Sequence, residues 1–158
     1  MILAAVATGP ALAEAWQTYV NERFGTTADV PAGWQAGEPP ANGDGLRFTA
    51  PDGSASVAVF GSLQTFDTID ETIAIYEAPV DGETITYRHR DDRGLVLSGT
   101  RDDRIFYRRW ILSCGEAVWN GIAIEYPAAE KKAYDPLVTH MSRSLRPGTG
   151  WQVEDCPD

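Results

Sequence analysis

The chain has 158 residues, of which 43% are hydrophobic and 10% aromatic, and its formal net charge is −10. This length suits one domain, and the apolar content is enough for a packed core, which excludes a disordered chain. Because 23 acidic residues stand against 13 basic ones, the surface repels phosphate backbones and anionic lipid. We therefore expect no nucleic-acid partner.

The N-terminal stretch 1–13 has the composition of a secretory signal peptide. It is small and apolar, with no charge before Glu14, and Ala-Leu-Ala at 11–13 is a small-x-small cleavage site. The basic leading region is missing, so we expect the natural start to lie further upstream. A Gly-Pro pair argues against the alternative, an N-terminal core helix, and the stretch is too short to cross a bilayer. The sequence thus predicts an exported chain, periplasmic or secreted, with one domain over 14–158 and no membrane span.

Turn-rich segments divide the next part of the chain into short strands. The segment 31–45 is filled with Pro, Gly, Asn and Asp, and it is predicted to be a loop. The sequence APDG at 50–53 predicts a tight turn, because proline presets φ and glycine accepts a positive φ. The predicted strands beside these segments are 19–24, 26–30, 46–49 and 56–60.

The apolar period changes to that of a helix in the segment TFDTIDETIAIYEAP. Ile69, Ile73 and Tyr76 recur at i, i+4 and i+7, which is the spacing of one helical face. Thr68, followed three residues later by a glutamate, fits a capping box, and Pro79 ends the predicted helix.

Four more strands and a long helix are predicted in the second half. The helix covers 128–145, or it begins at Asp135-Pro136. The predicted strand 105–113 is apolar on both faces, so it lies between two layers. This order implies the α+β class: an antiparallel β-sheet of about six or more strands packed with two main α-helices. The four strands are 84–89, 95–98, 105–113 and 117–126.

The tetrapeptide Arg-Asp-Asp-Arg occurs twice, at 90–93 and 101–104. Each copy falls between consecutive predicted strands, so the two lie at opposite ends of the sheet, roughly 20 Å apart at ~3.3 Å per residue. Four carboxylates that far apart cannot form one metal or acid–base site. We interpret both copies as hairpin turns, in which the flanking arginines neutralise the aspartates locally.

Other candidates for catalysis or metal binding are isolated in the sequence. His89 and His140 have no Cys, His or carboxylate at metal-ligand spacing, so we assign them surface or packing roles. Glu125 can act as an acid or a base, but no partner for it can be named. The sequence has neither a serine-hydrolase elbow nor a phosphate-binding loop. We predict no metal, no cofactor and no catalytic residue.

One of the five tryptophans lies in an unusual place. Trp110 and Trp119 fit the predicted core, whereas Trp34 lies in the Pro/Gly-rich loop. An aromatic side chain there is either tucked back as a plug or presented to a ligand. We expect any ligand site to border this loop. The candidate ligand-binding residues are Trp34, Asn42 and Asp44.

The two cysteines, Cys114 and Cys156, are predicted to form a disulfide. An exported compartment oxidises exposed thiols, and an even number of cysteines suits a pair. The last helix must return the chain over the sheet, which can bring the C-terminal tail beside the strand end at Cys114. The alternative is a buried free Cys114 and an intermolecular or reactive Cys156.

The segment YVNERFGTTADVP, at 19–31, resembles the opening of small exported proteins of alphaproteobacteria. In these, an N-x-R-F-G strand pair ends at a proline, and a loop and an N-G-D-G-x-x-F strand follow, matched here at 42–48. Segments 104–115 and 125–148 extend the match over most of the mature chain, while Thr26 stands where an aromatic residue often follows the glycine. The group is similar to the PsbP-like fold, an antiparallel sheet between helices. This resemblance implies an exported accessory or binding protein.

Several functions remain open. The first is a non-catalytic binding or accessory module, expected to be a monomer, whose partner is an unknown protein or small molecule in the periplasm. The second is a periplasmic hydrolase with a site assembled from Glu125, Asp135 and His140, which a polar cleft joining at least two of them favours. The third is an inhibitor or immunity-type protein whose acidic surface masks a basic enzyme.

Overall fold

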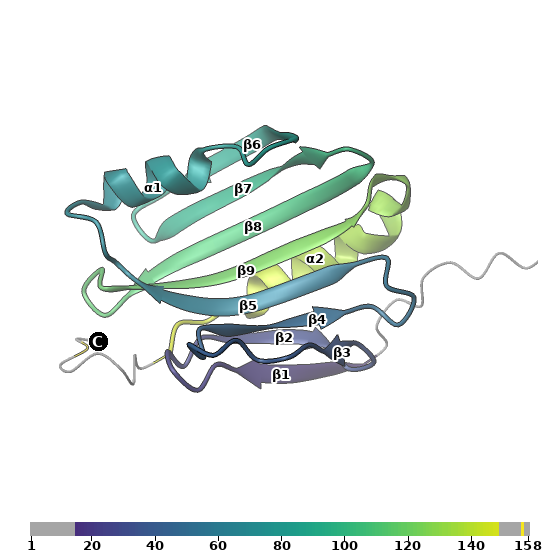
Figure 1. The fold of residues 1–158 in the computed structure, drawn as a ribbon, viewed down its shortest axis with the longest axis horizontal. Coiled ribbons are helices and arrows are strands. Elements are labelled where there is room, and N and C mark those ends of the chain that lie inside the picture. Colours follow the sequence, from purple (N-terminus) through teal and green to yellow (C-terminus); the bar gives the residue numbers. More distant parts are fainter. Residues whose placement is uncertain (1–14, 149–155, 157–158) are drawn as a thin grey trace, which may run out of the picture.

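The computed structural model describes residues 15–148 and Cys156 (Figure 1). The predicted signal peptide lies outside the described residues. Seven antiparallel strands form the main sheet in the order β3-β4-β5-β9-β8-β7-β6, and β1 and β2 form a separate two-stranded sheet. The predicted α+β class is confirmed. The strands are β1 (Trp16–Val20), β2 (Thr27–Pro31), β3 (Gln35–Ala36), β4 (Gly45–Thr49), β5 (Ser56–Leu63), β6 (Glu83–Arg90), β7 (Gly94–Arg101), β8 (Arg104–Ser113) and β9 (Val118–Pro127); the helices are α1 (Ile69–Glu77), a 3₁₀ turn (Ala128–Glu130) and α2 (Lys131–Ser144).

The main sheet has an apolar layer on each side, and each α-helix packs on one of them. Along β8, Tyr107 and Ile111 pack against the core that contains α2, whereas Trp110 and Leu112 belong to the core that contains α1. Because successive strand residues point to opposite faces, this alternation places the two helices on opposite sides. The prediction that this strand lies between two layers is confirmed. We call the two sides the α1 face and the α2 face.

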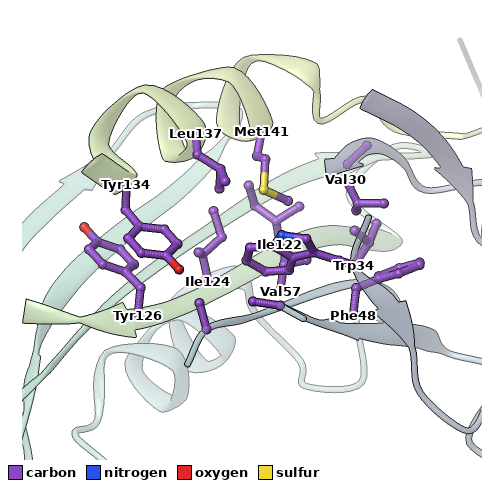
Figure 2. Packing of buried hydrophobic residues seen from close by; sticks show 14 of the residues in the cluster. Val30, Trp34, Phe48, Val57, Ile122, Ile124, Tyr126, Tyr134, Leu137 and Met141 are labelled. Carbon is purple, nitrogen blue, oxygen red and sulfur yellow. The ribbon is translucent and has the colours of Figure 1, made fainter. Parts of the chain in front are cut away.

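The α2 face carries the larger core. Tyr134, Leu137 and Met141, spaced at i, i+3 and i+7, point from α2 onto β9 and β5 (Figure 2). Ile122 of β9 and Val57 of β5 lie beneath them and are fully buried. The sheet is therefore fixed to α2 mainly through its middle strands.

The capping box predicted for α1 is present. The Glu71 amide donates to Thr68 Oγ1 at 3.2 Å, and the Thr68 amide donates to Glu71 Oε2 at 3.1 Å. Two of the helix's first backbone donors are satisfied in this way, which starts the helix at Ile69. The predicted tight turn also forms: Gly53 has a φ of 73°, and its amide donates to Ala50 O.

The first predicted strand, 19–24, was misplaced, because β1 spans Trp16–Val20. This strand ends at Val20, because the Asn21 side chain forms hydrogen bonds with the turn that follows. Asn21 Oδ1 accepts from the Phe24 amide, and Asn21 Nδ2 donates to Gly43 O, each at 2.8 Å. Gly25, with a φ of 73°, completes the turn into β2.

The alternative start of the last helix at Asp135-Pro136 is wrong. The chain enters α2 through the 3₁₀ turn, and Pro136 lies inside the helix. The proline lacks the amide that would donate one turn back, so α2 has one hydrogen bond fewer there. Lys131 pairs with Asp135 one turn later at 2.8 Å.

The predicted disulfide is present. Cys114, just after β8, is bonded to Cys156, and their Cα atoms lie 4.3 Å apart. The bond attaches the end of the chain to the end of a central strand. Within the part of the chain that the structure describes, we find no helix long and apolar enough to cross a membrane.

Candidate functional site

Helix α2 covers only half of its face of the sheet. One row of paired residues crosses five strands: His89 of β6, Val96 of β7, Arg109 of β8, Ile122 of β9 and Val59 of β5. Ile122 and Val59 are fully buried, Arg109 and Val96 are half-buried, and His89 is exposed. The cover therefore ends over β8. Beyond it lies an open shelf, which we define as the α2-face residues Tyr87, His89, Val96 and Ser98.

A groove of about 770 Å³ lies at this boundary. It runs between the C-terminal end of α2 and the strands β7 and β8, and its lining is both polar and apolar. A second groove of about 730 Å³ adjoins it beside the disulfide. The residues that line the first groove include Val96, Tyr107, Arg109, Ile111, Ser142 and Leu145.

Polar side chains of β8 meet the end of α2 at Ser142. Tyr107 Oη lies 2.7 Å from Ser142 Oγ. Arg109 Nη1 donates to the Ser142 carbonyl oxygen and, at 3.4 Å, to its hydroxyl. Within residues 15–148 and Cys156, no carboxylate pairs with the Arg109 guanidinium. The groove thus contains a half-buried cation whose acceptors among these described residues are neutral oxygens.

The charges of the chain are unevenly distributed. Residues 88–109 contain seven of the 13 Lys and Arg residues but only four of the 23 Asp and Glu residues. These residues form β7, most of β8 and the end of β6. This segment of the chain is therefore basic in an otherwise acidic protein, but Arg101, Arg104 and Arg108 project from the α1 face, away from the groove.

Both Arg-Asp-Asp-Arg copies lie in turns, as predicted, but local neutralisation by the flanking arginines is wrong: Arg90 of the first copy pairs with Asp70 of α1. Arg101 and Arg104 instead pair with Glu125 of β9, with Arg104 Nε 2.6 Å from Glu125 Oε1. They can do so because all three side chains project from the α1 face, while Asp102 points from the turn tip and is exposed. Burial raises the pKa of Glu125, but hydrogen bonds from Arg101 and Arg104 outweigh it and lower the pKa overall.

A second glutamate completes this ion-pair network on the α1 face. The Glu83 side chain is fully buried, and Arg108 Nη1 donates to its Oε2 at 3.1 Å. Arg101 Nη1 lies 3.9 Å from Glu83 Oε1. The desolvation of Glu83 would raise its pKa, but the arginines and a backbone amide lower it overall. The arginines of this network are thus paired within the protein, in contrast to Arg109.

The predicted ligand-binding residues lie at the other edge of the sheet. Trp34 is 9% exposed and packs in the core on the α2 face (Figure 2), which is the plug alternative. Asn42 Nδ2 donates to Asp44 Oδ2 at 2.6 Å, and Arg23 pairs with the same carboxylate. Asp44 directly precedes β4, which lies four strands from β7. Ligand binding at Trp34, Asn42 and Asp44 stays a prediction.

The structure does not bring together the residues of the hypothetical hydrolase site. Glu125 lies on the α1 face, whereas Asp135 and His140 are on α2, on the other side of the sheet. Asp135 pairs with Lys131 in the same helix, and His140 Nε2 lies 2.9 Å from Asp29 Oδ2.

Sequence reasoning missed the groove, although one signal for it was present. Ile105, Tyr107, Arg109 and Ile111 occupy alternate positions of β8, so a single arginine interrupts an apolar row. A charged residue at such a position indicates either a partner within the protein or a binding site.

No protein-family model matches the chain, and no curated protein matches its sequence. Several solved structures match the chain in three dimensions. The solution structure of cyanobacterial PsbP (CyanoP) from Synechocystis sp. PCC 6803 superposes with a TM-score of 0.61 at 11% identity, covering 92% of this chain and 98% of that one. The chain has the PsbP-like fold.

The chain is also similar in fold to a protein from yeast. The crystal structure of the Saccharomyces cerevisiae Ran-binding protein Mog1p matches with a TM-score of 0.54 at 12% identity, covering 84% of this chain and 95% of that one. At these identities the likeness concerns the fold alone. The fold implied by the sequence resemblance is confirmed.

Proposed function

We propose that the protein is a non-catalytic binding or accessory module of the periplasm, and that its partner occupies the groove between α2 and β8. The observation that carries this proposal is the groove itself. It combines apolar side chains with a few convergent polar groups, Tyr107, Arg109 and Ser142, which is typical of binding sites. The partner is a protein or a small molecule, and the free protein is a monomer.

Two further observations support the proposal. The disulfide between Cys114 and Cys156 is typical of an oxidising compartment, in agreement with export. Mog1p, which shares the fold, is described as a Ran-binding protein, so the same architecture serves protein binding in that case. Because one fold can host many functions, the groove has more weight in this proposal than the likeness.

The proposal is tested by blocking the groove. Val96→Arg places a long side chain on the open shelf, and Thr49→Arg is the matched control on the α1 face of β4. Each full-length protein is immobilised and exposed to periplasmic extract, and the retained proteins and small molecules are identified by mass spectrometry. We expect the wild type and Thr49→Arg to retain the same partner and Val96→Arg to lose it. Retention by all three folded proteins would contradict binding at the groove.

A further inference from the structure

Arg109 is the only charged residue on the α2 face of β8. It lies in the row of Tyr107 and Ile111, and its cross-strand neighbours are Val96 and Ile122. A half-buried guanidinium loses hydration, and that cost is offset when an anion pairs with it. Without an anion, Arg109 is held at a position that the sheet would otherwise fill with an apolar side chain.

The other arginines of β8 provide an internal comparison. Arg104 and Arg108 project from the opposite face, and they pair with Glu125 of β9 and Glu83 of β6, respectively. Arg109 instead donates from Nη1 to the two oxygens of Ser142. A guanidinium has five N–H donors, and its Nε and Nη2 donors find no acceptor among the residues that the structure describes. The planar fork that remains matches the two oxygens of a carboxylate.

Solvent-exposed apolar surface lies beside this fork. Val96 is half-buried, and Tyr87 on the same shelf is 53% exposed. Ile111 and Leu145 add apolar surface from β8 and from the end of α2. The groove volume of about 770 Å³ is within the range of small-molecule sites. An apolar group that lies on the shelf would thus be in reach of Arg109.

The outer end of the groove limits the charge of a ligand. Asp91 and Asp92 line this end together with one arginine, Arg93, and Asp91 lies 3.8 Å from the imidazole of His89. The two carboxylates outnumber the arginine there. A second anionic group, or a polyphosphate, would meet these carboxylates. The site therefore fits a ligand with a single anionic group.

We propose that the groove binds a carboxylate carried on an apolar body. Arg109 forms the bidentate contact, Val96 contacts the body in the groove, and Tyr87 contacts it on the shelf beside the groove. This inference rests on the proposed function and gives the chemical class of its ligand. The carboxylate belongs either to a free organic acid or to the C-terminus of a polypeptide, and the two sources share this chemistry.

Titrations of the ¹⁵N-labelled full chain, followed by NMR, test the inference in two arms. The first arm compares octanoate with octanamide and with inorganic phosphate. The second compares a hexapeptide ending in leucine as the free acid and as the C-terminal amide. In at least one arm we expect the carboxylate to shift the amide resonances of β7, β8 and the end of α2. We also expect it to bind about tenfold or more tightly than its amide, since hydrogen bonds to charged groups are strong.

Variants then assign the contact. Arg109→Gln should weaken binding of the carboxylate about tenfold or more but leave the amide unaffected. Arg47→Gln, an exposed arginine on the α1 face, is the matched control and should change neither. If Arg109→Gln does not fold, the comparison of acid with amide on the wild type decides alone.

Three results would overturn the inference: no binding of either carboxylate at millimolar concentration, equal binding of acid and amide, or binding of phosphate as tight as that of octanoate. The proposed function is judged separately, by the Val96→Arg variant. If Val96→Arg loses a partner but no carboxylate binds, the groove is a binding site for a different chemical class.

Discussion

Asp102 adopts a left-handed backbone conformation at the tip of the β7–β8 turn, with a φ of 53°. Asp and Asn tolerate this region better than most residues do. Asp91, in the β6–β7 turn, has a different role: its Oδ1 accepts from the amides of Arg93 and Gly94 at 2.8 and 3.0 Å. These backbone hydrogen bonds lower the pKa of Asp91. The two aspartates thus stabilise turns for separate reasons.

Replacing both aspartates tests the turn interpretation. We expect Asp91→Asn with Asp102→Asn to change the free energy of unfolding by well under ~1 kcal/mol, because Asn keeps the acceptor and tolerates the left-handed region. Asp102→Val should cost about 1–2 kcal/mol, since a β-branched side chain is strained there. Urea unfolding measures both. Loss of a bound metal or of an activity in the double Asn variant would contradict the interpretation.

Glu125 is predicted to contribute a pH-dependent part of the stability. At pH 7, Glu125→Gln should lower the free energy of unfolding by about 1–3 kcal/mol, because Arg101 and Arg104 lose a charged acceptor. The folded-state pKa of Glu125 lies below its ordinary value of 4.5. The stabilisation is therefore complete above 4.5 and is lost as the pH falls through the lower folded value.

Urea unfolding of the wild type and Glu125→Gln between pH 7 and about pH 3 checks this. The difference between the two proteins should shrink on acidification. Asp135→Asn is the control, because its pair with Lys131 is exposed and should contribute at most about 0.5 kcal/mol. A difference that stays constant with pH would contradict the ion-pair account.

At the scale of elements, α1 depends on its N-terminal cap. Thr68→Ala removes the acceptor of the Glu71 amide, and we expect a loss of about 1 kcal/mol in the free energy of unfolding. Thr68→Ser should restore most of it, because serine caps equally well. Thr65→Ala, at an exposed loop position nearby, should have little effect. Equal losses in the Thr65 and Thr68 variants would show that the cap is not the cause.

The β1–β2 hairpin is attached to α2 by a small group of contacts. The His140 ring stacks on Trp16 at 3.8 Å between centroids and lies within hydrogen-bond distance of Asp29. Ser144 Oγ accepts from the Asp29 amide at 2.9 Å. We expect His140→Ala to speed amide hydrogen exchange in β1 and β2 while the central strands stay protected. Faster exchange throughout the sheet would mean that the hairpin is not a separate unit.

At the scale of the whole molecule, the disulfide joins the end of the chain to the sheet. Cys114→Ser with Cys156→Ser should lower the free energy of unfolding by about 4 kcal/mol, as the chain-entropy model gives for a separation of 42 residues. Thiol titration of the unfolded, unreduced protein should find no reactive thiol. Two thiols per chain would contradict the bond.

Much of the fold follows from short-range patterns in the sequence. The alternation along β8, the Thr68 capping box and the turn at Gly53 depend on residues close together in the chain, so their signals are local. The end of β1 was misjudged, and the start of α2 was left open between two positions. The first depends on a bond from Asn21 to Gly43, a residue of another loop, and the second on a helix that tolerates Pro136.

The sequence by itself determined the α+β class, the central strand with two apolar faces, the turns and the pairing of the only two cysteines. The spacing of apolar residues, the turn-forming residues and the even number of cysteines can all be read directly from the chain. Tertiary structure alone decided which charges meet. Glu125 and Arg101 are 24 residues apart, and Asp29 and His140 are 111 residues apart. Periodicity assigns a side chain to a face, but the coverage of that face depends on where α2 ends over the sheet. That packing leaves Arg109 at the boundary of the core, beside an open groove.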